Sequence, residues 1–531
     1  MDFKKLLFFK EPETKSDFVL ENRQSYPKST DDGFKISSKI NVNEEYVKKR
    51  LNYPKNNDII IKDFTIKGER KCFSIAIEGM VNSQLIDDAI IEPMLKLPYI
   101  NDEKIFTSKD AAAKKLISHF SSSTTEDIEL VFEEVNFGSC AVFVDGFDIA
   151  FIMDVRMWGH RSINKPENEQ SIYGPQEAFA EMLRNNSALV RKILKTEKLI
   201  CEAVKVGQKS KTRGVLMYID DIANDELVAE VKRRVEGIKK DYIIAIDEVA
   251  LFLDESTNSM TNQILGTERP DRVAMALADG RVALLLNGSP RALIFPTTIY
   301  ELMHTATDAY LKPPFANMSR ILRMLGMFIS ILLPGIYLAI TLFHQEMIPT
   351  YLLYAISASR ENVPFPSVVE MLLMNFSFEI IRQAGIQMPG PIGSTLGIVG
   401  GLILGQAAVS AKIVSPIMII IIAITGIGSF ATSDYTLSWA HRLLRIVFIL
   451  LGAGFGFYGI AIGIFIYSVI LGAQKNFGVS FLSPLPSNGF KKLGGSIFVD
   501  PVYKQEMRPE YLKTKNPVKE PKISRSWRKK R

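Results

Sequence analysis

Side chains that could carry acid–base, nucleophilic or metal chemistry are few in this sequence and show none of the spacings that such chemistry needs. The five histidines are scattered: His119, His160, His304, His344 and His441. They form no HExxH pair, and the sequence has neither a Walker loop nor a serine elbow. Asp220 and Asp221 could hold Mg²⁺, but an acidic pair that leads into a helix usually stabilises its first turn. We therefore expect no enzyme activity, no metal site and no cofactor.

A second set of residues lies inside an apolar stretch, "PGPIGSTLGIVGGLILGQAAVSA", residues 389–411. Glycine recurs every fourth residue at Gly393, Gly397, Gly401 and Gly405. At 100° per residue, the first three glycines lie on the helix face opposite a stripe that contains Thr395, Val399, Leu402, Gln406 and Ser410. Small residues at this spacing let membrane helices approach closely. The stripe would then face either the water of a pore shared by several copies or a second packed helix.

Three charged residues mark a possible membrane boundary just before that stretch. Glu370, Glu379 and Arg382 interrupt the apolar residues 363–387. Glu379 and Arg382 are three residues apart, so they could pair on one helix face. A charge at membrane depth indicates either function or anchoring at the interface. We expect 363–387 to be an interfacial or re-entrant helix.

Long uncharged windows surround these residues. Asp, Glu, Lys and Arg are absent from 324–343, 383–411, 413–433 and 446–474. Each window reaches about 20 residues, the length that crosses a hydrocarbon core of roughly 30 Å. The sequence therefore predicts an integral membrane protein with a helical transmembrane domain over 291–480. Its predicted spans are about 324–343, 390–411, 413–433 and 446–472.

The carboxyl terminus supports a cytoplasmic location for both ends of the chain. The tail 481–531 holds thirteen Lys or Arg residues against four Asp or Glu. Basic segments beside a membrane span stay in the cytoplasm and contact lipid or solvent, so we expect no nucleic acid. With four crossings, Lys412 would mark a cytoplasmic turn. Arg442 and Arg445 would then lie outside, against the positive-inside rule.

The first half of the chain has the pattern of a soluble α/β protein. Residues 1–45 are polar and predict a flexible leader. Strand-like and helix-like segments then alternate, which predicts two α/β subdomains over 46–155 and 156–290. Asp145-Gly146 and Asn287-Gly288 each separate two apolar runs, as in a hairpin. No repeat of 20 to 50 residues is visible, and three cysteines without metal-ligand spacing are typical of reduced thiols.

Several long segments stand together in an order that is characteristic of one family. They include "YGPQEAFAEMLRNNSALVRK", "KSKTRGVLMYIDDIAN", "TERPDRVAMALADGRVALLLNGSPRALIFPTT" and "GSTLGIVGGLILGQAAVSAKIVSP". With these segments the chain resembles the A subunits of the nutrient germinant receptors of bacterial spores, the GerA type. The resemblance covers about residues 44–485.

This resemblance implies a cytoplasmic region of two α/β subdomains and a helical domain in the inner membrane of the spore. It implies a complex with a transporter-like B subunit, which senses nutrient, and a lipoprotein C subunit. It further implies a homo-oligomer, a pentamer, whose channel releases monovalent cations and starts germination. The pore interpretation of the stripe gains support from this picture, and no catalytic residue is carried over.

Other functions are compatible with the same residues. The chain could be a scaffold that passes on a signal without conducting ions, or a paralogue that amplifies germination without sensing nutrient. A secondary transporter is a third alternative, although four spans without paired inverted halves argue against it.

Overall fold

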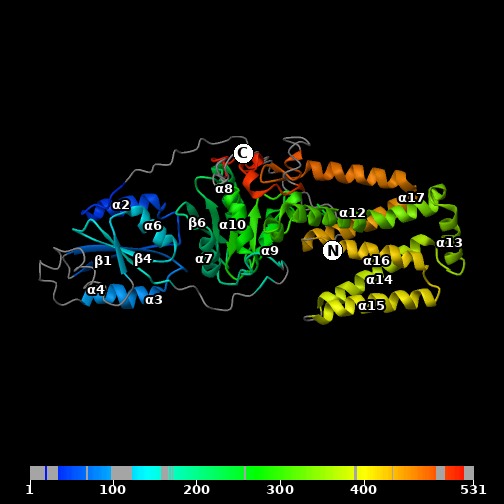
Figure 1. Cartoon of the computed structure of the whole chain (residues 1–531), viewed down its shortest axis with the longest axis horizontal. Coiled ribbons are helices and arrows are strands. Elements are labelled where there is room, and N and C mark those ends of the chain that lie inside the picture. Colours follow the sequence, from blue (N-terminus) through cyan, green and yellow to red (C-terminus); the bar gives the residue numbers. More distant parts are fainter. Residues whose placement is uncertain are drawn as a thin grey trace, which may run out of the picture.

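The structure is a computed structural model of the whole chain. It describes residues 18, 20, 34–66, 70–96, 122–156, 165–166, 169, 171–255, 259–387, 391–432, 434–485 and 497–519. Within the helices, the side chains of 89, 93, 386, 391–399, 402 and 435 are not described. Two α/β bodies and a bundle of helices follow one another along the molecule (Figure 1). This arrangement confirms the predicted fold class.

The first α/β body, subdomain 1, is a five-stranded antiparallel sheet in the order β1-β2-β4-β5-β3 with helices beside it. Its elements are α2 (Ile40–Arg50), β1 (Ile59–Ile66), β2 (Arg70–Ile77), α3 (Ser83–Ile86), η1 (Asp87–Ile91), α4 (Glu92–Lys96), β3 (Ser122–Thr125), α6 (Ile128–Asn136), β4 (Cys140–Val144) and β5 (Ala150–Met153). The predicted turn at Asp145-Gly146 connects β4 to β5, and Gly146 has a φ of 91° there, which favours glycine.

Subdomain 2 repeats this arrangement in the order β6-β7-β9-β10-β8. Its elements are α7 (Leu183–Ile193), β6 (Leu199–Val206), β7 (Thr212–Ile219), α8 (Asp225–Glu236), α9 (Ile246–Leu253), β8 (Leu265–Thr267), α10 (Pro270–Ala278), β9 (Val282–Leu286), β10 (Ala292–Phe295) and α11 (Ile299–Met303). The predicted turn at Asn287-Gly288 joins β9 to β10. The two subdomains therefore have the same strand order, and in each a helix precedes the first strand (α2 and α7) and the fourth strand (α6 and α10).

A buried asparagine plays the same role in both subdomains. In α2, Asn43 Oδ1 accepts a hydrogen bond from the amide of Ser37 at 2.8 Å, and its side-chain amide donates to the carbonyl of Ser37. In α7, Asn186 makes the same two bonds with Ala180, the first also at 2.8 Å. Both asparagines hold a residue six positions earlier in the chain. They lie 143 residues apart, far beyond the spacing of short repeats.

The hairpin turns supply a second equivalence. Asp145 Oδ1 accepts a hydrogen bond from the amide of Ile40 at 3.1 Å, at the start of α2. Asn287 Oδ1 accepts one from Leu183 at 3.3 Å, at the start of α7. In each subdomain a side chain from the hairpin loop, β4–β5 or β9–β10, thus binds the start of the leading helix, α2 or α7. These shared bonds identify the subdomains as two copies of one structural unit.

Beyond subdomain 2, the described chain forms a short hairpin of β11 (Lys475–Asn476) and β12 (Val479–Ser480) and, before it, a bundle of six α-helices. The helices are α12 (Pro313–Phe343), α13 (Thr350–Arg360), α14 (Ser367–Gln387), α15 (Pro391–Ser410), α16 (Pro416–Phe430) and α17 (Tyr435–Ala473). Two helices, α12 and residues 436–473 of α17, are long and apolar enough to cross a membrane, and α16 is a shorter apolar helix. Figure 1 shows the helices lying roughly side by side, with α13 at the end far from the subdomains.

Close contacts between glycines fix the direction of the bundle helices. Early in α12, Gly326 lies against Gly428 near the end of α16. Further along α12, Gly335 lies against Phe448 of α17. Since α12 starts at subdomain 2, α17 leaves the subdomains in the same direction and α16 approaches them. The loop between α16 and α17 therefore lies at the end of the bundle next to the subdomains.

Helix α14 differs from the expected interfacial or re-entrant helix. It is continuous over 21 residues and lies along α16. Near its start, Glu370 accepts a hydrogen bond from the amide of Ser415 at the beginning of α16. Eight residues later, Phe378 packs on Gly426 near the end of α16. The helix thus passes through the bundle, because its charged side chains find partners inside it.

Helix α17 differs from the expected single span over 446–472. Gly456 has φ 59° and ψ −140°, which reverses the chain. The second half returns along the first: a methyl group on Gly459 would collide with the carbonyl oxygen of Leu451, and Gly463 faces the side chains of Leu451 and Phe448. The predicted span is therefore divided into two antiparallel helical segments.

Both ends of the chain are packed on subdomain 2 where the structure describes them. Leu20, in the predicted flexible leader, is 2% exposed in the core of subdomain 2, beside Phe477. In the predicted basic tail, Leu512 is fully buried, and Lys515 Nζ lies 2.6 Å from Asp225 of α8. Local composition suggested solvated termini because it does not show these distant contacts. The last residues, 520–531, lie outside the described part.

Candidate functional site

Helix α15 presents two different faces to its surroundings. On one face Gly401 lies 3.9 Å from the ring of Phe378 of α14, and Gly405 lies 3.4 Å from Ile419 of α16, as measured from a methyl group placed on each glycine. On another face, Gln406 and Ser410 are exposed in the single chain. The remaining predicted residues lie outside the described side chains: Gly393, Thr395, Gly397, Val399 and Leu402. The helix-packing and pore-lining roles stay predictions.

Glu370 lies at the end of the bundle far from the subdomains. Its carboxylate is fully buried, accepts from the amide of Ser415 at 3.0 Å, and lies 3.6 Å from Nε of Arg360. It therefore neutralises the positive end of the α16 dipole and faces the cation of α13. A buried carboxylate with both partners fixes the ends of α13, α14 and α16 relative to one another.

Glu379 and Arg382 form the predicted pair on α14, and the structure extends it to α17. Glu379 Oε1 binds Arg382 and also lies 3.2 Å from Nη1 of Arg442. The guanidinium of Arg442 lies 4.4 Å from the ring of Trp439. These residues lie in the half of the bundle next to the subdomains.

That placement corrects two expectations about orientation. Arg442 and Arg445 lie toward the subdomains, and Lys412 lies in the turn between α15 and α16 at the opposite end. The sequence pattern assigned them the other way round because it did not treat α14 as a pass through the bundle. One additional pass reverses the direction of every later helix, so the arginines lie on the same side of the bundle as the subdomains.

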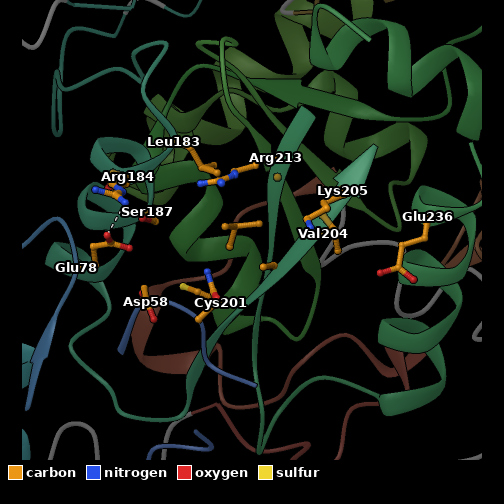
Figure 2. Close-up of a pocket in the computed structure, with 14 residues that line it drawn as sticks. Asp58, Glu78, Leu183, Arg184, Ser187, Cys201, Val204, Lys205, Arg213 and Glu236 are labelled. Atoms are coloured by element: carbon orange, nitrogen blue, oxygen red, sulfur yellow. Dashed lines mark hydrogen bonds and ion pairs between the residues drawn. The ribbon is translucent and has the colours of Figure 1, made fainter. Parts of the chain in front are cut away.

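A cleft of about 700 Å³ lies at the boundary between the two subdomains, and Figure 2 shows the residues that line it. Subdomain 1 and subdomain 2 both supply charged side chains to it: Asp58, Glu78, Arg184, Lys205, Arg213 and Glu236. Glu78 and Arg184 face each other across the boundary, and their carboxylate oxygen and guanidinium nitrogen are 2.7 Å apart. Its size and its position between two subdomains are typical of a small-molecule site. Two of its carboxylates are paired within the chain, Asp58 with Arg191 and Glu78 with Arg184.

A buried ion pair forms the floor of this boundary. Arg191 of α7 is 2% exposed, and its Nη2 donates to Asp58 Oδ1 at 2.8 Å and to the carbonyl of Leu199 at 3.0 Å. Cys201 is buried beside it, and burial raises the pKa of this thiol well above its usual value. Cys201 is therefore a neutral packing residue, and it is free, as are Cys72 and Cys140.

Sequence reasoning missed the cleft because its residues are distant in the chain. One signal was present in α7: Asn186, Ser187 and Arg191 occupy positions where the helical period of Leu183 and Val190 calls for apolar residues. All three are buried. Polar residues on the inward face of a helix need partners, so such a pattern indicates a polar interface between units.

The junction between subdomain 2 and α12 contains another buried carboxylate. Asp308 is 1% exposed and accepts a hydrogen bond from Nε of Arg320 at 3.1 Å. Arg323 pairs with the same carboxylate, and these arginines hold the pKa of Asp308 below its usual value. The start of α12 is thereby fixed to the end of subdomain 2.

Three comparisons give the chain its relatives. A family model described as Bacillus/Clostridium GerA spore germination protein matches residues 45–511. The chain is 37% identical to spore germination protein KA of Bacillus subtilis (strain 168), over 88% of this chain and 86% of that protein. It is 32% identical to spore germination protein GerLA of Bacillus cereus, over 88% and 94%. The crystal structure of the N-terminal domain of the A subunit of the Bacillus megaterium germinant receptor GerK3 matches with 26% identity and a TM-score of 0.39, over 49% of this chain and 96% of that domain.

Proposed function

Because the chain belongs to the Bacillus/Clostridium GerA family of spore germination proteins, we propose that it is the A subunit of a nutrient-responsive germinant receptor. In this proposal it lies in the inner membrane of the spore, with its subdomains and its carboxyl-terminal segment in the cytoplasm. It works with a transporter-like B subunit, which senses nutrient, and with a lipoprotein C subunit.

The finer part of the proposal is that this subunit conducts monovalent cations. The observation that carries it is the exposure of Gln406 and Ser410 on α15, while Gly405 on the same turn is buried. A polar side chain that faces lipid is costly, so these two residues call for water or another protein surface. Five copies would satisfy them by arranging α15 around a shared pore.

Gating would use the two faces of α15. A ligand bound by the complex changes helix packing against Gly401 and Gly405, and α15 moves relative to α14 and α16. Val399 and Leu402 form the apolar constriction in this mechanism. Its wetting lets cations pass, and its drying stops them.

The test is cation flux through liposomes that contain this chain with its co-expressed partners, with and without nutrients. Val399→Ala and Gln406→Leu are compared with the wild-type chain. Gln383→Leu is the matched control, because Gln383 is also exposed but lies on α14. We expect nutrient-dependent flux that both stripe variants change and that the control leaves unchanged, at equal assembly.

The second candidate is a scaffold that passes on a signal without conducting ions. Subdomain 2 packs against Leu20, against the described carboxyl-terminal segment, and against the start of α12 and the residues after α17. These contacts favour a scaffold, since they can transmit movement without a pore. Assembled complexes that bind nutrient and pass no cations would establish this alternative. A paralogue that amplifies germination would conduct or signal without responding to nutrient by itself.

A further inference from the structure

The end of the bundle next to the subdomains contains an excess of positive charge. Arg382 of α14 and Arg442 and Arg445 of α17 lie there with one carboxylate, that of Glu379. A single oxygen of Glu379 serves both Arg382 and Arg442. Arg445 instead donates to uncharged acceptors: the carbonyl and hydroxyl oxygens of Ser330, both at 2.8 Å, and Asn375 Oδ1 at 3.0 Å. Two guanidinium groups therefore share one carboxylate oxygen, and the third donates its hydrogen bonds to uncharged groups.

Two of these guanidinium groups also have unused donors. The Nε atoms of Arg382 and Arg442 are buried and have no hydrogen-bond partner within the described chain. Their side chains are only 11% and 7% exposed. Leaving a buried charged donor unpaired is costly, so the site calls for an additional acceptor.

Trp439 indicates where that acceptor comes from. Its ring lies 4.4 Å from the Arg442 guanidinium and 5.7 Å from that of Arg382, yet the residue is 41% exposed at the side of the bundle. Tryptophan prefers the headgroup level of a bilayer, where one part of the ring is apolar and the other is wet. The unused donors thus lie at the depth where lipid phosphates are found.

We propose that Arg382, Arg442 and Trp439 bind the phosphate of an anionic phospholipid in the leaflet that faces the subdomains. A phosphate oxygen accepts from planar guanidinium groups in the fork geometry that arginine offers, and its charge balances the excess. Basic pockets between membrane helices on the cytoplasmic side are suited to such headgroups. The site needs no ion conduction, so it stands apart from the channel proposal and depends only on the bundle being in a membrane.

The experiment measures lipid preference of the purified full-length chain in detergent. Phosphatidylglycerol and phosphatidylcholine compete for binding, and retained lipid is counted by native mass spectrometry. The variants are Arg382→Gln and Arg442→Gln. Lys412→Gln is the control, because it removes one exposed positive charge at the opposite end of the bundle. A separate arm adds inorganic phosphate without lipid.

We expect the wild-type chain and Lys412→Gln to prefer phosphatidylglycerol over phosphatidylcholine. In each arginine variant this preference should be about fivefold smaller. If Arg442→Gln does not fold, Arg382→Gln decides, because it leaves Glu379 paired with Arg442. An unchanged preference in the arginine variants overturns the proposal. The proposal is also overturned if inorganic phosphate binds as well as lipid does, because this result would identify a free anion as the ligand. A site filled by a carboxylate of a second copy would instead make the variants impair oligomer formation at constant lipid preference.

Discussion

Replacing Gly456 by alanine tests whether α17 is a helical hairpin. The backbone there has φ 59° and ψ −140°, a conformation that residues other than glycine rarely adopt. Strain of this kind costs about 1–3 kcal/mol. The new methyl group would also lie 3.1 Å from Cβ of Phe343 and 3.2 Å from Nε2 of His344, tighter than ordinary contact. Gly456→Ala should therefore destabilise the bundle.

Gly454→Ala is the matched control, two residues earlier in the same helix. No atom lies within 4 Å of the methyl group that it adds. In a helix interior, alanine is more stable than glycine by about 0.5–1 kcal/mol. The two substitutions are chemically identical and should have opposite signs.

Thermal unfolding of the full chain in detergent compares the two variants. A second measurement is the protease sensitivity of residues 497–519, because the return of α17 delivers this segment to subdomain 2. A straight helix of 39 residues would be about 58 Å long, far more than a bilayer core of roughly 30 Å, and would carry the segment away. Equal stability of the two variants, with the segment equally protected, would refute the hairpin.

Three further predictions concern the soluble half. Arg191→Met leaves Asp58 buried and unpaired, so it should cost about 3–5 kcal/mol in chemical denaturation, and adding Asp58→Asn should restore part of the loss. Asn43→Ala and Asn186→Ala should each lower the free energy of unfolding by about 1–3 kcal/mol, and by similar amounts, because the two asparagines play one role in duplicated units. A large decrease in only one of the two variants would contradict the duplication. Burial, together with nearby arginines, lowers the pKa of His304 to about 3. The unfolded chain takes up a proton at this histidine below about pH 6.5, so the free energy of unfolding should fall between pH 6.5 and 3 by up to about 1.4 kcal/mol per pH unit. His304→Gln should flatten that slope in a pH series of melting curves.

Sequence reasoning succeeded where the physical cause is local. Turn chemistry at Asp145-Gly146 and Asn287-Gly288 predicts the hairpins, because the turn needs those residue types whatever surrounds it. Long uncharged windows predict helices that could cross a membrane, since hydrophobic length follows from neighbouring residues, and α12 and residues 436–473 of α17 are long and apolar enough. The order of whole segments resembled one family, and the family comparison confirms that membership.

It failed where the cause lies elsewhere in the chain. Glu370 and Glu379 appeared to exclude α14 from the bundle, but each has one partner far along the chain, Ser415 45 residues away and Arg442 63 residues away. Glycines in α17 look alike in the sequence, although Gly456 turns the chain and Gly463 permits close packing. The duplication of the subdomains stayed hidden because equivalent positions often carry different residues, such as Asp145 and Asn287, that make the same bond.

Subdomain 2 is the mechanical link between the cleft and the membrane helices. The start of α12 is fixed to it through Asp308, and the return of α17 ends in Phe477, which is buried in its core. Subdomain 1 contacts the cleft but none of these attachment points. A ligand that closes the cleft would therefore act on the bundle through subdomain 2, and α12 and α17 would move together because both are attached there. Since α15 contacts α14 and α16, which in turn pack on α12 and α17, movement of subdomain 2 would reach Gln406 and Ser410 of α15 without any direct contact between these residues and the cleft.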